Sequence, residues 1–125
     1  MSLILIIIIP ILRFSASEDF QFRNYREILI FSPAKENILL EKQLLIFDKD
    51  PEGLKERDLK ISVNVWSAKQ DAMHRKWKID QKKFVFILIG KDGQEKFRFE
   101  KPTTLKQLYS IIDMMPMRRS EMKKQ

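Results

Sequence analysis

Basic and acidic side chains stand close together at three places in this 125-residue chain. An arginine forms directed, bidentate hydrogen bonds to a carboxylate, so such pairs either fasten two elements together or orient and polarise a bound substrate. No spacing among these residues selects a reaction, so we treat them as candidate binding residues and assign no catalytic residue. The candidates are Arg57, Asp58, Lys91, Asp92, Asp113, Arg118 and Arg119.

Two further residues raise the question of catalysis or metal binding. Ser32 follows an apolar run, but no G-x-S-x-G motif surrounds it and the chain has a single histidine, His74. Serine is a preferred N-cap residue and Pro33 suits the first helical position, so Ser32 is expected to cap a helix. His74 has no second histidine and no cysteine at ligand spacing, which favours a solvated helix position. We therefore predict no metal site and no cofactor.

The net charge and the absence of cysteine narrow the range of possible partners and reactions. The chain has 24 Lys and Arg against 17 Asp and Glu, a formal net charge of +7. This excess favours an acidic glycan, an anionic lipid or an acidic protein as partner, through long-range attraction. Without cysteine, the chain cannot form a disulfide, bind zinc through thiolates or perform thiol redox chemistry. Its length fits one domain, which we expect to be monomeric.

The first seventeen residues are predicted to form a signal peptide. An apolar block from Leu3 to Leu12 is too short to cross a hydrocarbon core of about 30 Å as a helix, and small residues around Ala16 follow it. Cleavage after Ser17 would leave a single domain, 18–125, in a secreted or periplasmic location. Export also disfavours nucleic acid as a partner. An uncleaved anchor and a buried first strand are the alternatives.

The rest of the chain alternates strands and helices. Apolar runs at 27–32 and 84–90 predict strands buried on both faces, whereas alternating patterns at 58–66 and 95–100 predict outer strands. The 58–66 strand is expected at the edge of the sheet. The residues expected on the buried faces of the helices are Ile38, Leu44, Leu45, Ala72, Met73, Leu105, Leu108, Ile111, Ile112 and Met115.

Capping signals predict where the helices begin and end. The first helix is expected to run from Ser32 to the turn residues at 47–53. A capping-box pattern at 67–70 begins a short second helix, and Thr103 or Thr104 caps the last one. The resulting order, β-α-β-α-β-β-α, predicts an α/β fold with a four-stranded mixed sheet and helices on both faces.

This order, with the two apolar strands in the middle, is that of a thioredoxin-like fold. Redox members of that fold carry a Cys-x-x-Cys pair after the first central strand, where this chain reads SPAKE at 32–36. They also have a proline before the third strand, where this chain reads IDQKKFVF at 79–86. A thiol-free relative of the fold is therefore expected.

Three motifs give a more specific resemblance. They are ERDL at 56–59, LIGKDGQEKFRF at 88–99 and IDMMPMRRSEM at 112–122. Together they resemble the uncharacterised secreted domain shared by small bacterial proteins and by animal sushi-repeat-containing and coiled-coil-domain extracellular matrix proteins. The resemblance covers about residues 23–122. It implies a thioredoxin-like fold and secretion, with adhesion or matrix interaction as the role in animal relatives and no assigned activity.

Chain direction places the candidate residues at one end of the predicted sheet. The second strand starts near Arg57, and the turn at 90–93 and the end of the last helix near Asp113 lie at the same end, opposite Ser32. We hypothesise that one of the candidate arginines pairs with one of the candidate aspartates there, to fasten the fold or to bind a ligand. The charged segment at 118–124 is expected to be a solvated tail.

Two functions remain open at this point. The favoured one is a noncatalytic binding module, secreted or in the cell envelope, that engages an anionic partner. The alternative is an enzyme of unrecognised type that uses the Arg and Asp cluster to orient or polarise a substrate.

Overall fold

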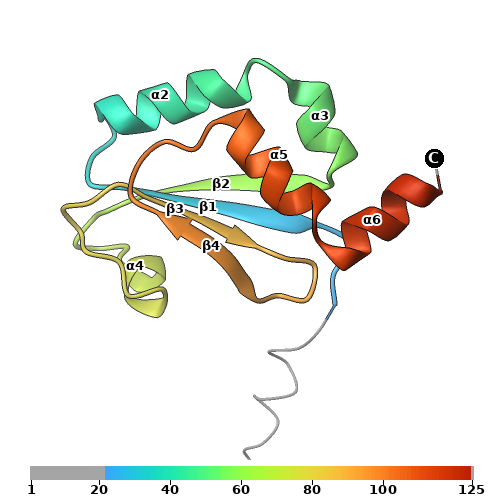
Figure 1. Ribbon diagram of the computed structural model, residues 1–125. Helices are drawn as coiled ribbons and strands as arrows, with labels where there is room; N and C mark the ends of the chain where they lie inside the picture. The colour runs from blue at the N-terminus through green and yellow to red at the C-terminus, as the bar shows by residue number, and fades with distance from the viewer. Residues whose placement is uncertain (1–21, 125) are drawn as a thin grey trace, which may run out of the picture.

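The computed structural model of the protein describes residues 22–124 (Figure 1). The predicted signal peptide, 1–17, lies outside the described residues. The elements are β1 (Arg26–Ser32), α2 (Ile38–Phe47), α3 (Pro51–Glu56), β2 (Leu59–Val65), α4 (Ala72–Lys76), β3 (Val85–Ile89), β4 (Glu95–Phe99), α5 (Leu105–Asp113) and α6 (Pro116–Lys123).

The four strands form one mixed sheet in the order β2-β1-β3-β4. β1 and β2 are parallel, while β1–β3 and β3–β4 are antiparallel. The two uniformly apolar strands, β1 and β3, lie in the middle, and the alternating strands lie at the edges. The sheet predicted from the sequence is therefore confirmed, including the edge position of the 58–66 strand.

Helices cover both faces of the sheet, and each face has its own core. Successive strand residues point to opposite faces, so Ile28 and Ile30 of β1 pack beneath α2, α3 and α5, whereas Leu29 and Phe31 pack against α4 (Figure 1). The first core is the larger, because three helices contribute to it and only the short α4 contributes to the second.

The first helix begins later than predicted. Ser32 is the last residue of β1, fully buried, and its hydroxyl donates to the Ala34 carbonyl at 2.7 Å. The N-cap of α2 is Asn37, whose side chain accepts from the backbone N–H groups of Leu39 and Leu40, both at 3.1 Å. The capping role predicted for Ser32 is wrong, because a second and equally favourable cap follows five residues later.

The buried face of α2 also differs from the prediction. The expected residues Ile38 and Leu45 are 67% and 64% exposed, and Leu44 is exposed as well. The buried positions are Leu40, Gln43 and Phe47, which recur at helical spacing and include a polar residue. The prediction of this stripe is wrong, because it followed hydrophobicity and had no place for a buried glutamine.

Two other helix predictions need correction. The expected turn at 47–53 contains the start of a separate helix, α3, whose N-cap Asp50 accepts from the N–H of Gly53 at 3.0 Å. The capping-box pattern at 67–70 does not start a helix; the Ser67 hydroxyl accepts from Lys69 in a turn, and α4 begins at Ala72. The same short polar residues bond backbone groups in turns and at helix N-caps, so the sequence alone does not distinguish a turn from a helix start.

The helix predicted to follow Thr103 or Thr104 is confirmed as α5. Thr104, one of the two expected caps, accepts from the N–H of Gln107, whose side chain in turn accepts from the N–H of Thr104. Leu108 and Ile112 are its buried residues. Among residues 22–124, no helix is long and apolar enough to cross a bilayer.

Candidate functional site

The candidate residues predicted from the sequence gather at one end of the sheet, which we call the N-terminal pole because β1 and β2 begin there. The parallel register aligns Arg26 with Leu59, and the N–H of Arg26 donates to the carbonyl of Asp58 at 2.8 Å. The antiparallel β3 ends at the same place, so its turn to β4 lies beside the junction of α5 and α6 (Figure 1).

Asp113 is the first centre of this pole. Arg57 donates to its two carboxylate oxygens from Nε and Nη2 at 3.1 and 2.9 Å, and Arg118 Nε donates to Oδ1 at 3.0 Å. Arg118 also reaches Glu56 through Nη2 at 2.7 Å. Burial acts to raise the pKa of Asp113, but the hydrogen bonds from the two arginines outweigh it and hold this pKa below its ordinary value.

Glu121 is the second centre. Arg26 Nη2 and Lys91 Nζ approach its Oε2 at 3.1 and 2.6 Å, and Lys91 also binds Asp58 at 2.8 Å. Burial again acts to raise the pKa of Glu121, and the hydrogen bonds from Lys91 and Arg26 lower it overall. The side chains of Arg26 and Lys91 are almost fully buried, so their charges depend on this carboxylate.

Not all predicted candidates join this network. Asp92 lies on the turn and pairs with Lys96 at 2.7 Å, and Arg119 is exposed and makes no ion pair within residues 22–124. The sequence reasoning missed Arg26, Glu56 and Glu121. Arg26 opens an apolar strand, where a buried charge is unexpected, but the spacing of Arg118 and Glu121 by three residues in one helix was a usable signal.

The network is neutral overall. It contains four cations and four carboxylates: Arg26, Arg57, Lys91, Arg118, Glu56, Asp58, Asp113 and Glu121. The segment expected to be a solvated tail is helix α6, and Arg118 is only 1% exposed, so that expectation is wrong. Each carboxylate here already faces a cation, which is the arrangement of a network that fastens α5 and α6 to the sheet.

A tyrosine covers one side of the network. The guanidinium carbon of Arg57 lies 3.7 Å from the centre of the Tyr109 ring, and the Tyr109 hydroxyl donates to Asp50 at 2.9 Å. Burial and then the nearby Asp50 carboxylate raise the pKa of Tyr109 to about 12. Tyr109 thus ties α5 to the cap of α3.

The opposite pole holds the position where thioredoxin-like enzymes carry thiols. Ser32 there is fully buried, and its hydroxyl donates to a backbone carbonyl. Its own carbonyl accepts from Trp66 N–H at 2.9 Å. Both polar groups of Ser32 are therefore engaged in local structure.

The α4 face of the sheet carries the clearest surplus of charge. Six Lys and Arg and two Asp lie in residues 69–83, a net charge of +4 out of the +7 of the whole chain. All six cations are exposed. Arg75 pairs with Asp71 and Lys83 with Glu100, both at long distances of 3.5 and 3.4 Å. The cations without an ion pair among the described residues are Lys69, Lys76, Lys78 and Lys82.

His74 of α4 anchors this face. It is 3% exposed, so the predicted solvated position is wrong, and its ring meets Phe31 edge-to-face with centroids 5.0 Å apart. Its Nε2 has no hydrogen-bond partner within the described chain. A hollow of about 440 Å³ lies beside it, lined also by Trp66, Lys78 and Lys82. No group of three or more possible metal ligands is assembled in residues 22–124.

The burial of His74 predicts a pH dependence of stability. Desolvation lowers its pKa from 6.5, against a smaller opposing effect of Asp71, whereas the unfolded chain keeps the ordinary value. The unfolded state therefore binds the proton more readily, so the contribution of His74 is complete above about pH 6.5 and is lost as the pH falls below it.

Urea titrations between about pH 7.5 and 5.5 measure this effect, because Asp113 and Glu121 titrate at lower pH. We expect the free energy of unfolding to decrease across this range in the wild type and to stay flat in His74→Phe. An equal decrease in both proteins would contradict the assignment to His74.

Proteins of known structure share this fold. Three solved structures are similar: a malarial protein (20% identity, TM-score 0.57, covering 72% of this chain and 96% of that one), the reduced 2-Cys peroxiredoxin of Plasmodium vivax (13%, 0.61, 77% and 80%) and the thioredoxin of Fasciola hepatica (16%, 0.55, 81% and 88%). These likenesses confirm the thioredoxin-like fold. No curated protein matches this chain. A family model described as Domain of unknown function (DUF4174) matches residues 18–121.

Proposed function

We propose that this chain, which belongs to the DUF4174 family of domains of unknown function, is a noncatalytic, exported binding module whose α4 face engages an anionic partner. The partner is an acidic glycan, an anionic lipid or an acidic protein. The observation that carries the proposal is the surplus of four positive charges within residues 69–83 on one face.

The α4 face suits a polyanion better than the N-terminal pole does. Its lysines are exposed, and Lys69, Lys76 and Lys82 have no carboxylate to displace within the described chain. At the pole, an anionic ligand would have to displace Asp113, whose carboxylate already accepts three hydrogen bonds from Arg57 and Arg118. The same pairing weakens the enzyme alternative, because these arginines are not free to polarise a substrate.

Export is supported by the composition of the first seventeen residues. The apolar block and the small residues after it fit a chain that is cleaved after Ser17. The family match begins at residue 18, next to the proposed cut.

One experiment addresses both parts of the proposal. Protein recovered from the medium or the envelope is weighed intact and then applied to a sulfated-glycan column, from which it is eluted with salt. We expect the mass of a chain that begins at Glu18 and retention that salt abolishes. Full-length chain in the cytosol would contradict export, and passage through the column at low salt would contradict the binding role.

Matched variants locate the binding face. The triple variant Lys69→Glu, Lys76→Glu, Lys82→Glu reverses three cations of the α4 face. The control Lys42→Glu, Lys49→Glu, Lys106→Glu makes the same change of net charge at exposed positions outside residues 69–83. Exposed ion pairs contribute roughly 0.2–1 kcal/mol each, so the first variant should bind about tenfold more weakly or worse. Equal weakening in both would show attraction without a defined face.

A further inference from the structure

The hollow beside His74 on the α4 face is lined by groups of mixed chemistry. Its volume of about 440 Å³ is within the range of small-molecule sites. Trp66 contributes a partly exposed aromatic ring, and Ile79 is the other apolar residue of the lining. The remaining lining residues besides His74 are Asp71, Arg75, Lys78, Asp80, Gln81 and Lys82.

The lining carries one net positive charge. Arg75 pairs with Asp71 at 3.5 Å, so this pair contributes none. Lys78 and Lys82 are exposed and make no ion pair among residues 22–124. Asp80 is the only further carboxylate of the lining, and it accepts from the backbone N–H of Lys82 at 2.9 Å. Both lysines are therefore available to an anionic group of a ligand.

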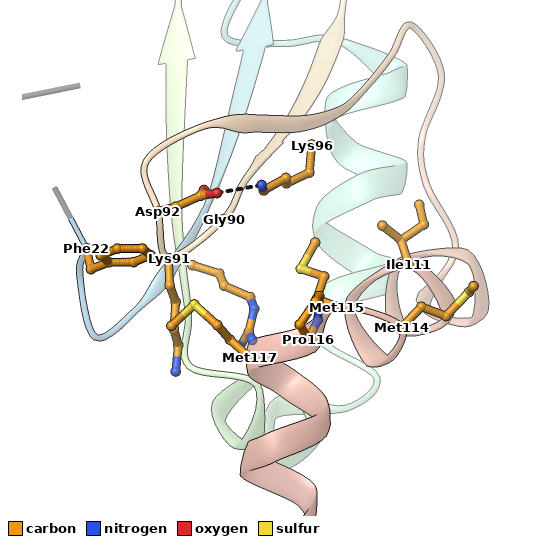
Figure 2. A pocket seen from close by; sticks show the side chains of 11 residues that line it. Phe22, Gly90, Lys91, Asp92, Lys96, Ile111, Met114, Met115, Pro116 and Met117 are labelled. Carbon is orange, nitrogen blue, oxygen red and sulfur yellow. Dashed lines mark hydrogen bonds and ion pairs between the residues drawn. The ribbon is translucent and has the colours of Figure 1, made fainter. Parts of the chain in front are cut away.

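The hollow at the N-terminal pole, of about 540 Å³, has no such available cations. Figure 2 shows the Lys96 ammonium beside the Asp92 carboxylate, with which it pairs at 2.7 Å. The other cations of that lining, Arg26 and Lys91, pair with Glu121. An anion gains more attraction in the hollow beside His74, where two lysines are unpaired.

The backbone of Lys78 is strained. Its φ is 57°, in the left-handed region that favours glycine. The N–H of Lys78 donates to the Arg75 carbonyl at 3.2 Å, and the N–H of Ile79 donates to the His74 carbonyl at 2.8 Å. In this helix-ending motif glycine is the usual residue, and strained residues concentrate at functional sites. A lysine at this position, lining the hollow, supports a role in binding.

The mixture of groups favours a sugar over the other anionic partners. A pyranose ring has an apolar C–H face, which packs on an aromatic ring such as Trp66. Its hydroxyls bond to carboxylate and amide groups such as those of Asp80 and Gln81. A ligand that is anionic along its whole length is repelled by Asp80, and an acyl chain finds only Trp66 and Ile79 as apolar contacts.

We propose that this hollow binds one sulfated sugar unit of an acidic glycan, with its ring against Trp66 and its sulfate at Lys78 and Lys82. The inference rests on the proposed function, because it names the partner class of the α4 face. Charge-assisted hydrogen bonds from the two ammonium groups hold the sulfate, and the ring contact distinguishes a sugar from a bare anion.

The indole N–H of Trp66 reports on this site. A sulfated heparin disaccharide is titrated into ¹⁵N-labelled protein, and the signals of the two tryptophans, assigned with Trp66→Phe, are followed by NMR. We expect a saturable shift of the Trp66 signal. The desulfated disaccharide and inorganic sulfate should each bind at least about tenfold more weakly, because each lacks one part of the ligand. Equal binding of either control, or no saturation by about 10 mM disaccharide, would overturn the proposal.

Lys78→Gly separates binding from stability. Glycine is favoured at this φ, so the melting temperature should not fall, whereas the affinity for the disaccharide should fall at least about threefold. Adding Lys82→Gln should bring the loss to about tenfold or more. Lys106→Ala removes the same charge at an exposed position outside the α4 face and should leave the affinity within about twofold. Equal losses in Lys78→Gly and Lys106→Ala would contradict the site.

Failure of this site is distinguishable from failure of the proposed function. If the sulfated-glycan column retains the protein but the disaccharide does not shift the Trp66 signal, the subsite is wrong and the binding face stands. Binding to phosphatidylglycerol vesicles without binding of the disaccharide would identify a lipid partner and overturn the sugar assignment. If neither the column nor the vesicles bind the protein, the proposed function is wrong as well.

Discussion

Arg118→Ala is expected to lower the free energy of unfolding by about 1.5–3 kcal/mol, the contribution of hydrogen bonds to charged groups. Arg118 is 1% exposed and joins Asp113 and Glu56. Its loss leaves Asp113 with Arg57 alone and leaves the space of a large side chain unfilled. Chemical denaturation monitored by circular dichroism measures the change.

The adjacent residue supplies the control. Arg119 is exposed on the same helix and makes no ion pair in the described chain, so Arg119→Ala should change stability by no more than about 0.5 kcal/mol. The contrast separates a specific buried network from a general effect of removing positive charge. If the two variants unfold at the same denaturant concentration, the fastening role of the pole is wrong.

The second large effect is expected from Gln43→Leu. The Gln43 amide is fully buried, donates to the Thr103 carbonyl at 3.0 Å and accepts from the Thr103 N–H at 2.7 Å. Leucine fills similar space but leaves both backbone groups without a partner, at about 1–3 kcal/mol for each. We therefore expect a loss of at least about 2 kcal/mol in the free energy of unfolding.

Lys42→Leu is the matched control for this variant, because Lys42 is the exposed neighbour in α2 and the substituted residue is the same. Its stability should stay within about 0.5 kcal/mol of the wild type. A loss in Gln43→Leu no larger than that in Lys42→Leu would show that water replaces the lost hydrogen bonds.

The sheet was predictable because its signals are strong and local. The apolar runs of β1 and β3 mark central strands, the alternation in β2 and β4 marks outer ones, and connection lengths decide which pairs are parallel. The same topology brought Arg57 and Asp113 together, since it fixes the end at which each element begins. The topology did not predict which individual side chains pair: Asp58 pairs with Lys91, and Asp92 pairs with Lys96 of β4.

The predictions of helix start and burial that were wrong share a physical cause. Ser32 and Asn37 are equally good caps in isolation, and the choice between them depends on how far β1 extends, which is set by its pairing with β2. Gln43 and Arg26 are buried because their polar atoms find partners 60 and 95 residues away in the sequence. Hydrophobicity patterns describe the burial of apolar surface and contain no information about such distant partners.

The docking of α6 also determines when folding is complete. Arg26, at the start of the first strand, meets its carboxylate only at Glu121, so nearly the whole polypeptide must be available before this buried guanidinium is neutralised. Closing so long a loop costs chain entropy before the contact forms, which makes it a late event compared with local helix formation. During synthesis, Arg26 and Lys91 at the N-terminal pole therefore lack Glu121 until α6 has been made. The ion pairs with Glu121 are expected to form last.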